Sequence, residues 1–146
     1  MATKITKATT FWIKAGAMSG GSRNQIELTD ELVRFFDQAS RNAEKCDVRL
    51  PNGSIATGRP AKHRGRRYGQ WVDIWRLGLP TSRQGGPRYP GSVIRLDKVK
   101  TTNRFIYEMT VTSAGSFVFR QWRAAARAKG KTSSTGGPSG RFYGYW

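Results

Sequence analysis

The sequence predicts a mainly β (α+β) domain, in which about seven short, mostly antiparallel strands form a barrel-like sheet beside two short helices. Stretches of aromatic and β-branched residues alternate with polar ones, which is typical of half-buried strands. Segments containing Gly, Asn and Pro separate these stretches, as hairpins require. The chain has 146 residues, 37% hydrophobic and 12% aromatic, so one packed domain is expected rather than a disordered basic tail.

The first part of the chain predicts five strands and one helix. Four strands are expected at residues 10–14, 24–28, 46–50 and 70–75, and Ile55 and Thr57 start a fifth, which returns from the third. Thr29 is suited to cap a short amphipathic helix over residues 30–40, whose apolar side chains would close the core. The pair Asn52-Gly53 is a strong hairpin signal between the third and fourth strands.

The second part predicts two strands and one helix. The strands are expected at residues 92–96 and 105–112, after a loop over residues 78–91 that holds several Gly and Pro. Ser116 is suited to cap a helix that runs to about Ala128, with Gly130 beyond its end. We therefore expect an N-terminal tail (1–9), one domain (10–130) and a Gly/Ser-rich linker or C-terminal tail (131–146), whose aromatic end can pack back as an edge strand.

Charge is the dominant compositional feature. The chain holds 26 Lys and Arg against 9 Asp and Glu, a net charge of +17. Six of the acids lie within residues 27–47, whereas residues 49–95 hold ten bases and a single acid, Asp73. This distribution predicts a polyanionic partner, with nucleic acid ahead of a membrane surface, and predicts that residues 27–47 face away from it.

Several classes of protein are disfavoured by what the sequence holds. With one Cys (Cys46) and one His (His63), neither a disulfide framework nor a Cys/His zinc site is expected. No apolar run is long enough to span a membrane, and the N-terminus resembles no secretory signal. The pairs Glu44-Lys45 and Asp97-Lys98 have no obvious partner acid for a metal-dependent nuclease. We therefore expect a non-enzymatic domain without a cofactor.

Two basic segments are the candidates for nucleic-acid contact. The glycine-containing loop from Lys14 to Gln25 offers hydrogen-bonding groups and close backbone approach, although an ordinary loop explains it equally well. Residues 59–76 mix Arg, Lys and His with Gln, Tyr and Trp, a combination suited to both phosphates and base edges. Its alternative interpretation is a solvated basic hairpin. Trp12 and Trp122 are expected in the core, while Trp71 and Trp75 fit either packing or base stacking.

The order of these features resembles the B-three-like DNA-binding pseudobarrel family. The resemblance covers roughly residues 10–128. It is carried by Phe11-Trp12-Ile13-Lys14, Gly20-Gly21, Ile26-Glu27-Leu28, the helix from Leu32 to Phe36, Val48-Arg49-Leu50-Pro51-Asn52-Gly53, the basic arm to Trp75-Arg76 and Pro90-Gly91-Ser92-Val93-Ile94-Arg95-Leu96. The N-terminal part and the 59–76 arm look most like the recognition domain of EcoRII-type restriction endonucleases. Ser92 stands where plant members usually carry an acid, which favours the restriction-enzyme branch.

The resemblance implies a seven-stranded open pseudobarrel that grips the DNA major groove between two arms. Here these arms would be residues 14–25 and 62–76, and the implied partner is double-stranded DNA with a CCWGG-like site. It also implies a nuclease domain elsewhere and a cytoplasmic, nucleoid-associated location in a prokaryote. The candidate DNA-binding residues are Lys14, Ser22, Arg23, Asn24, Gln25, Lys62, His63, Arg64, Arg66, Arg67, Tyr68, Gln70, Trp71, Asp73 and Arg76. The alternatives are a general RNA- or ribosome-associated domain and an autonomous nuclease.

Overall fold

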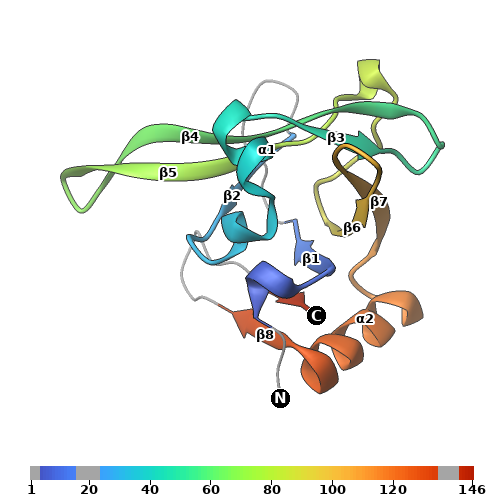
Figure 1. Cartoon of the computed structure of the whole chain (residues 1–146). Helices are drawn as coiled ribbons and strands as arrows, with labels where there is room; N and C mark the ends of the chain where they lie inside the picture. Colours follow the sequence, from blue (N-terminus) through green and yellow to red (C-terminus); the bar gives the residue numbers. More distant parts are fainter. Residues whose placement is uncertain (1–3, 16–23, 135–141) are drawn as a thin grey trace.

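The computed structural model of the chain describes residues 4–15, 24–134 and 142–146, apart from the side chain of Arg67. Within these residues the fold is mainly β, with nine strands rather than the seven predicted (Figure 1). The strands are β1 (Thr10–Lys14), β2 (Gln25–Leu28), β3 (Cys46–Arg49), β4 (Ile55–Arg67), β5 (Gln70–Gly78), β6 (Ser92–Lys100), β7 (Phe105–Ser113), β8 (Lys131–Ser134) and β9 (Phe142–Tyr145). The helices are α1 (Gln38–Ala43), α2 (Phe117–Lys129) and three short 3-10 turns, η1 (Ile5–Lys7), η2 (Leu32–Phe35) and η3 (Ser82–Gln84).

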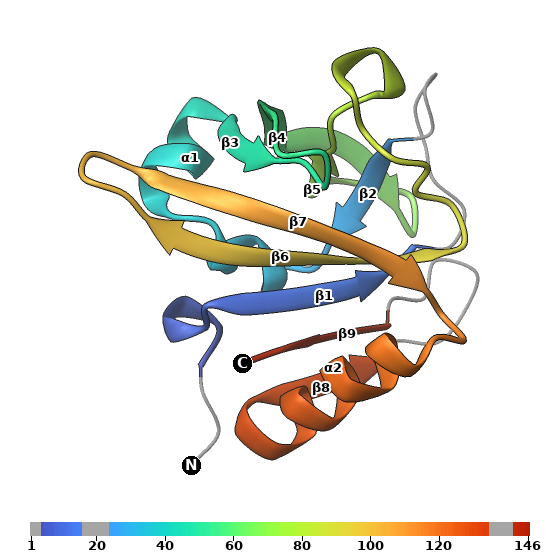
Figure 2. The same ribbon diagram turned by 90° about the vertical axis from the view of Figure 1, so that its right-hand side faces the viewer.

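All nine strands belong to one mixed sheet, which does not close into a barrel. Its order is β2-β5-β4-β3-β7-β6-β1-β9-β8, and every pairing is antiparallel except the parallel pair β3–β7. Figure 2 shows β7, β6, β1 and β9 side by side, with α2 lying along them. The predicted hairpin at Asn52-Gly53 is confirmed between β3 and β4, and Gly53 has the positive φ (89°) that such a turn favours.

The sequence misplaces both ends of the domain. Residues 131–134 and 142–145, expected in a linker or tail, form β8 and β9, and β9 pairs with β1. The aromatic end thus packs back on the sheet as a strand, but β9 is an inner strand rather than the expected edge strand, and the polar β8 forms the edge of the sheet. At the other end, η1 lies in the expected N-terminal tail and buries Ile5 and Ala8 in the main core.

The helix predicted over residues 30–40 is divided in two. Thr29 Oγ1 accepts a hydrogen bond from the backbone N–H of Leu32 (3.0 Å). The N-cap position of the short η2 is nevertheless Glu31, which makes no side-chain cap hydrogen bond, so the prediction of Thr29 as the cap of a helix over residues 30–40 is wrong. Phe36 is then extended, and Asp37 caps α1 by accepting from the Ser40 backbone N–H. Phe35 and Phe36, on either side of this division, are both fully buried in the core, whereas α1 buries none of its residues.

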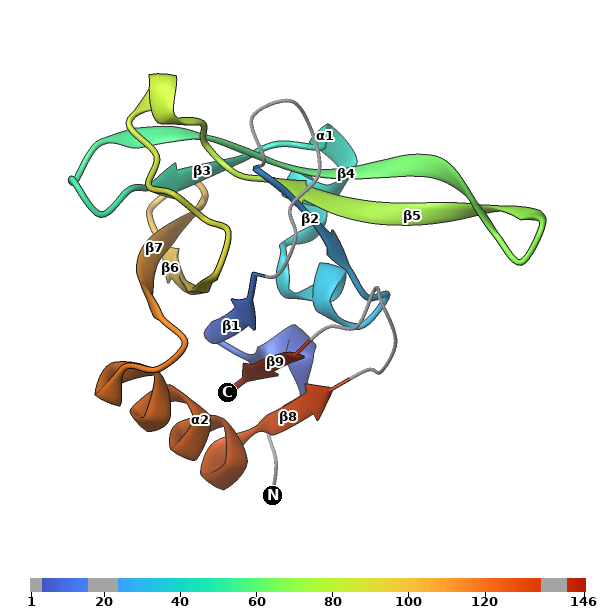
Figure 3. The same ribbon diagram turned by 180° about the vertical axis from the view of Figure 1, so that it is seen from behind.

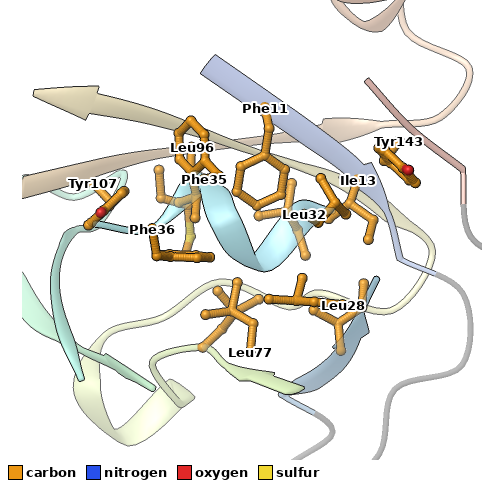
Figure 4. Close-up of a cluster of buried hydrophobic side chains, with 14 of the residues drawn as sticks. Phe11, Ile13, Leu28, Leu32, Phe35, Phe36, Leu77, Leu96, Tyr107 and Tyr143 are labelled. Carbon is orange, nitrogen blue, oxygen red and sulfur yellow. The ribbon is translucent and has the colours of Figure 1, made fainter. Parts of the chain in front are cut away.

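The main core fills the space between β1–β6 and β2–β5, with η2 at its centre (Figure 4). Phe11 of β1 packs edge-to-face on Phe35 of η2, with ring centroids 4.7 Å apart. Leu28 and Leu77 close it from β2 and β5. An aromatic pair of this kind stabilises the core beyond the free energy gained by burying its apolar area. Because η2 packs against residues of both parts of the sheet, it links them.

A second cluster lies on the opposite face of β1 and β6, beneath α2. Trp12 and Trp122, both predicted to be core residues, are 0% and 6% exposed. Ser116 caps α2 by accepting from the Phe119 N–H (3.1 Å), as predicted. At the rim, the Arg95 guanidinium lies between Trp122 and Trp146 and donates to Asp97 (2.9 and 3.0 Å). Both faces of this part of the sheet are therefore covered, whereas the hairpin β4–β5 extends away from them.

Candidate nucleic-acid interface

The hairpin formed by β4 and β5 is the most distinctive part of the structure (Figures 1 and 3). Its ladder runs from the pair Arg59–Gly78 to the pair Arg67–Gln70, nine pairs in all. At about 3.4 Å per residue this ladder is about 27 Å long. The pairing of β4 with β3 ends at Gly58, and β2 pairs with β5 only up to Trp75. We call residues 59–78 the arm, because its outer part is a two-stranded ribbon.

The arm completes the prediction for the fourth strand, which the sequence indicated only by its start at Ile55 and Thr57. Pro60 and Gly65 weaken the strand signal in this segment. Pro60 is tolerated because β4 has left β3 by that point, and proline fits a strand with one open edge. At Gly65, an added Cβ would collide with the Ile74 side chain, so the missing side chain lets Ile74 lie across the ribbon and become buried.

One face of the arm lines a groove of about 480 Å³, which we call the basic groove. Because side chains alternate along strands, every second residue of β4 faces it together with its cross-strand partners on β5. Three cationic or titratable side chains contribute, Arg59, His63 and Arg76. The full lining is Asn24, Gln25, Thr57, Arg59, Ala61, His63, Arg76, Gly78, Leu79, Thr81 and Gln84. These residues offer guanidinium, amide and hydroxyl groups, which suit phosphate oxygens and base edges.

The basic groove unites parts of the two segments that the sequence singled out. Asn24 and Gln25 come from the first segment, and His63 and Arg76 from the second. The contact follows from the pairing of β2 with β5 and from the Asn24 side-chain amide, which donates to the Leu79 carbonyl (2.6 Å). The sequence did not predict that β2 and β5 are neighbours.

Four polar residues of the groove were missed as contact candidates. Arg59 opens the basic segment and carries the same signal as the residues that were chosen. Thr81 and Gln84 form a reciprocal capping box on η3, and the Thr-x-x-Gln spacing is recognisable in the sequence. Thr57 has no signal of its own, because only the alternation of a longer β4 turns it toward the groove.

The opposite face of the arm carries a second set of candidates. Lys62, Arg64 and Arg66 stand directly across from Trp75, Asp73 and Trp71. The Asp73 carboxylate lies 4.0 Å from the ammonium of Lys62 and 4.0 Å from the guanidinium of Arg64. We call this the cationic face. Lys62, Arg64 and Arg66 therefore lie on the face opposite the basic groove. The predicted contact residues form two surfaces rather than one.

The two tryptophans of the cationic face differ in exposure. Trp75 is partly buried against the main core, with Lys62 Nζ 5.7 Å from its ring centroid. Trp71, nearer the end of the arm, is 58% exposed beneath the Arg66 guanidinium (5.2 Å). Packing therefore accounts for Trp75, whereas Trp71 is available to a partner.

The remaining candidates either do not line the basic groove or lie outside the described residues. Tyr68 and Gln70 are exposed at the end of the arm. Lys14 is exposed at the end of β1, a strand separated from β2 by five others in the sheet order. Ser22, Arg23 and the side chain of Arg67 lie outside the described part of the chain.

One acidic residue borders the basic groove. Glu27 of β2 stands directly across from Arg76 of β5, on the same side of the sheet. The segment 27–47 therefore does not face away from the groove as a whole, contrary to the simple charge argument. The carboxylate of Glu27 lowers the net charge beside Arg76 on β5, whereas Arg59 on β4 stands across from Gly78.

The described residues contain no group of three His, Cys, Asp or Glu side chains arranged to hold a metal ion. Among the helices of this same part of the chain, none is long and apolar enough to cross a membrane. Comparisons with protein-family models, curated proteins and solved structures found no match. The resemblance to the B-three-like family thus stays a prediction.

Proposed function

We propose that the chain binds double-stranded DNA by inserting the arm into the major groove. The observation that carries this proposal is the protruding two-stranded ribbon, with cations on both of its faces. The major groove of DNA is about 12 Å wide and admits a two-stranded β-ribbon. An inserted ribbon brings both faces close to phosphates, which explains why cations are not confined to one side.

The two surfaces have different tasks in this proposal. Arg59, His63 and Arg76 in the basic groove hold the backbone of one strand, and Asn24 and Gln25 supply amides at its end. Lys62, Arg64 and Arg66 on the cationic face lie toward the other strand. Phosphate contacts of this kind fix position and affinity, while bidentate Arg or Gln contacts with base edges give specificity.

The resemblance to the recognition domains of EcoRII-type restriction endonucleases extends the proposal. In that role the chain selects a short duplex site, CCWGG-like, for a nuclease domain located elsewhere. The discriminating measurement compares a duplex that contains CCWGG with the same duplex in which the five bases are scrambled. At physiological salt we expect at least about a thousandfold preference. Equal affinity for both duplexes would exclude CCWGG as the recognised sequence, but it would not contradict general DNA binding.

A test of the arm itself uses two double variants of equal charge. Arg59→Ala/Arg76→Ala removes two cations from the basic groove. Arg120→Ala/Arg127→Ala removes two exposed cations from α2, which lies on the far side of the body (Figure 1). By fluorescence anisotropy on a 20-base-pair duplex, we expect the groove variant to bind about tenfold or more weakly, with a salt slope smaller by about two. The α2 variant should change affinity less than threefold.

Equal losses in the two variants would contradict the proposal, because they would show that only net charge matters. RNA binding is the second candidate function, and the exposure of Trp71 favours it, since single strands stack on exposed aromatic rings. It predicts that single-stranded RNA binds the wild-type protein at least as tightly as the duplex does. The same titration on single-stranded DNA and RNA therefore separates the two functions.

A further inference from the structure

The arm ends in two exposed aromatic side chains. Tyr68, in the turn between β4 and β5, is fully exposed (104%), and Trp71, three residues later, is 58% exposed. Aromatic rings of this size usually contribute to stability by burying 150–250 Å² each. The ribbon formed by β4 and β5 extends away from the other strands (Figure 3), and neither ring is buried in that way. The fold itself therefore gives little reason for aromatic residues here.

The backbone at Tyr68 makes the choice of residue more unusual. Tyr68 and Gly69 both have positive φ (53° and 78°), as a two-residue type I′ hairpin turn requires. Asn, Asp and Gly are preferred at the first of these positions, because a larger side chain there is in an unfavourable left-handed conformation. Tyr68 thus combines an unfavourable backbone with a fully exposed ring, a pattern more typical of a contact residue than of a turn residue.

Trp71 is held in place from the opposite strand. Arg66 is its cross-strand partner, and its guanidinium carbon lies 5.2 Å from the centre of the Trp71 ring. Arg66 Nη2 also donates to the Gly69 carbonyl (3.3 Å), which connects it to the turn. We call residues 66–71 the tip of the arm. The tip presents a tyrosine, a tryptophan and a guanidinium within one short stretch of ribbon.

We propose that Tyr68 and Trp71 form a stacking site for a nucleobase that is not held within a continuous base stack. This deepens and rests on the proposed DNA binding, because the arm must first enter a groove. Stacking on aromatic rings is favourable for every base, and a neighbouring guanidinium adds a cation–π contribution. An extrahelical or mismatched base is the preferred target, since it is free to stack without the cost of opening a pair.

The surrounding charge favours a nucleic acid over other partners for these rings. Lys62, Arg64 and Arg66 lie along the same face of the arm, and Asp73 is the one carboxylate among them. An anionic lipid surface also attracts aromatic and cationic residues, but there the aromatic side chains accompany a broad apolar face. The tip has two rings among polar neighbours, which suits single bases on a phosphate backbone.

The experiment uses one DNA sequence in two forms, a perfect duplex and the same duplex with one extra, central 2-aminopurine. Tyr68→Asn removes the ring and keeps a residue that tolerates the left-handed conformation, so the turn should be retained. Tyr68→Phe keeps the ring and is the matched control. We expect the wild type to bind the bulged duplex about tenfold more tightly and to quench its fluorescence. Tyr68→Phe should behave like the wild type. For Tyr68→Asn, the affinities for the bulged and the perfect duplex should differ by no more than about twofold.

The outcomes distinguish this inference from the proposed function. If the wild type and Tyr68→Asn both bind the two duplexes equally well, the stacking site is wrong and DNA binding stands. If the wild type binds no nucleic acid, the proposed function fails, and the inference fails with it. Loss of binding to vesicles of anionic lipid in Tyr68→Asn, without any preference for the bulge, would assign the tip to a membrane surface instead. Thermal unfolding of both variants checks that the fold is intact.

Discussion

Arg64 and Asp73 stand directly across from each other on β4 and β5, with their nearest charged atoms 4.0 Å apart. Their side chains are 69% and 51% exposed. Because water screens such a pair, it contributes at most about 1 kcal/mol to stability. Asp73 is the single acid among ten bases in residues 49–95, so its main effect is to lower the charge of the cationic face.

Replacing Asp73 by Asn should therefore strengthen binding to a duplex of arbitrary sequence. We expect an increase of a fewfold at 100 mM salt, with a slightly steeper salt dependence, since Lys62 and Arg64 become free to contact phosphates. Fluorescence anisotropy measures both quantities. Glu108→Gln is the matched control, because Glu108 is similarly exposed beside Arg49 in another part of the sheet. A lower affinity of Asp73→Asn for one particular sequence would instead show that this carboxylate contacts a base.

Asp37 should make the stability of the fold depend on acid pH. Burial acts to raise the pKa of Asp37, but hydrogen bonds from Ser40 and Tyr107, with nearby Lys98, lower it below the ordinary 3.8. The folded state thus binds its proton less readily than the unfolded chain does. The stabilisation is complete above the unfolded-state pKa and is lost as the pH falls through the lower, folded-state pKa.

The test of Asp37 compares urea unfolding of Asp37→Asn and the wild type between pH 6 and pH 2.5. At pH 6 the variant should be less stable by about 1 kcal/mol, because it loses charged hydrogen bonds at the cap of α1. The difference should narrow as the pH falls, since the wild-type carboxyl becomes neutral too. Asp30→Asn, at an exposed carboxylate, is the control and should show little difference throughout. A difference in the free energy of unfolding between Asp37→Asn and the wild type that stays constant with pH would show that Asp37 does not cause the pH dependence.

Cys46 should be unreactive while the protein is folded. It is 7% exposed, and burial, with smaller contributions from Asp47 and Asp37, raises the pKa of its thiol to about 12. The thiolate is the reactive form, so at pH 8 an aromatic disulfide reagent should react at least about a hundredfold more slowly than with a free cysteine. In denaturant the rate should become ordinary. Rapid labelling of the folded protein would mean that β3 opens locally from β4.

Much of the fold follows from local patterns in the sequence. The alternation in Phe105–Ser113 predicts β7 correctly, because one face of that strand is buried. Ser116 and Gly130 predict α2 correctly, because they mark its two ends. The outer part of β4 was missed since cross-strand partners on β5, rather than its own residues, keep it extended. The two surfaces of the arm were merged for the same reason. In a run of charged residues, the face of the sheet that each side chain occupies cannot be assigned until the strand and its register are known.

Gly144 shows why the sequence indicates the C-terminal strand only weakly. Its local signal is weak, because β9 has four residues and one is glycine. The structure requires that glycine for a distant reason. A Cβ at position 144 would lie 2.5 Å from Trp12 Cζ2 on the neighbouring strand β1. The contact joins residues 132 positions apart, which no local pattern reveals.

Gly144→Ala should therefore destabilise the fold by about 1–3 kcal/mol, as overpacking in a core does. Trp12 has little room to move, because its ring packs edge-to-face against both Phe119 (4.9 Å) and Phe142 (5.0 Å). Denaturant unfolding measures the change. Gly115→Ala is the matched control, since a Cβ there meets nothing within 4 Å, and it should be close to neutral.

The double variant Gly144→Ala/Trp12→Phe tests whether the Trp12 ring causes this loss. Trp12→Phe alone should destabilise the protein by leaving a cavity, although it also removes the indole N–H, which is buried without a hydrogen-bond partner among the described residues. The smaller ring leaves room for the new methyl group. The double variant should thus be more stable than the sum of the two single changes predicts, by about 1 kcal/mol. Strict additivity would show that the cost of Gly144→Ala arises from the backbone of β9 rather than from Trp12.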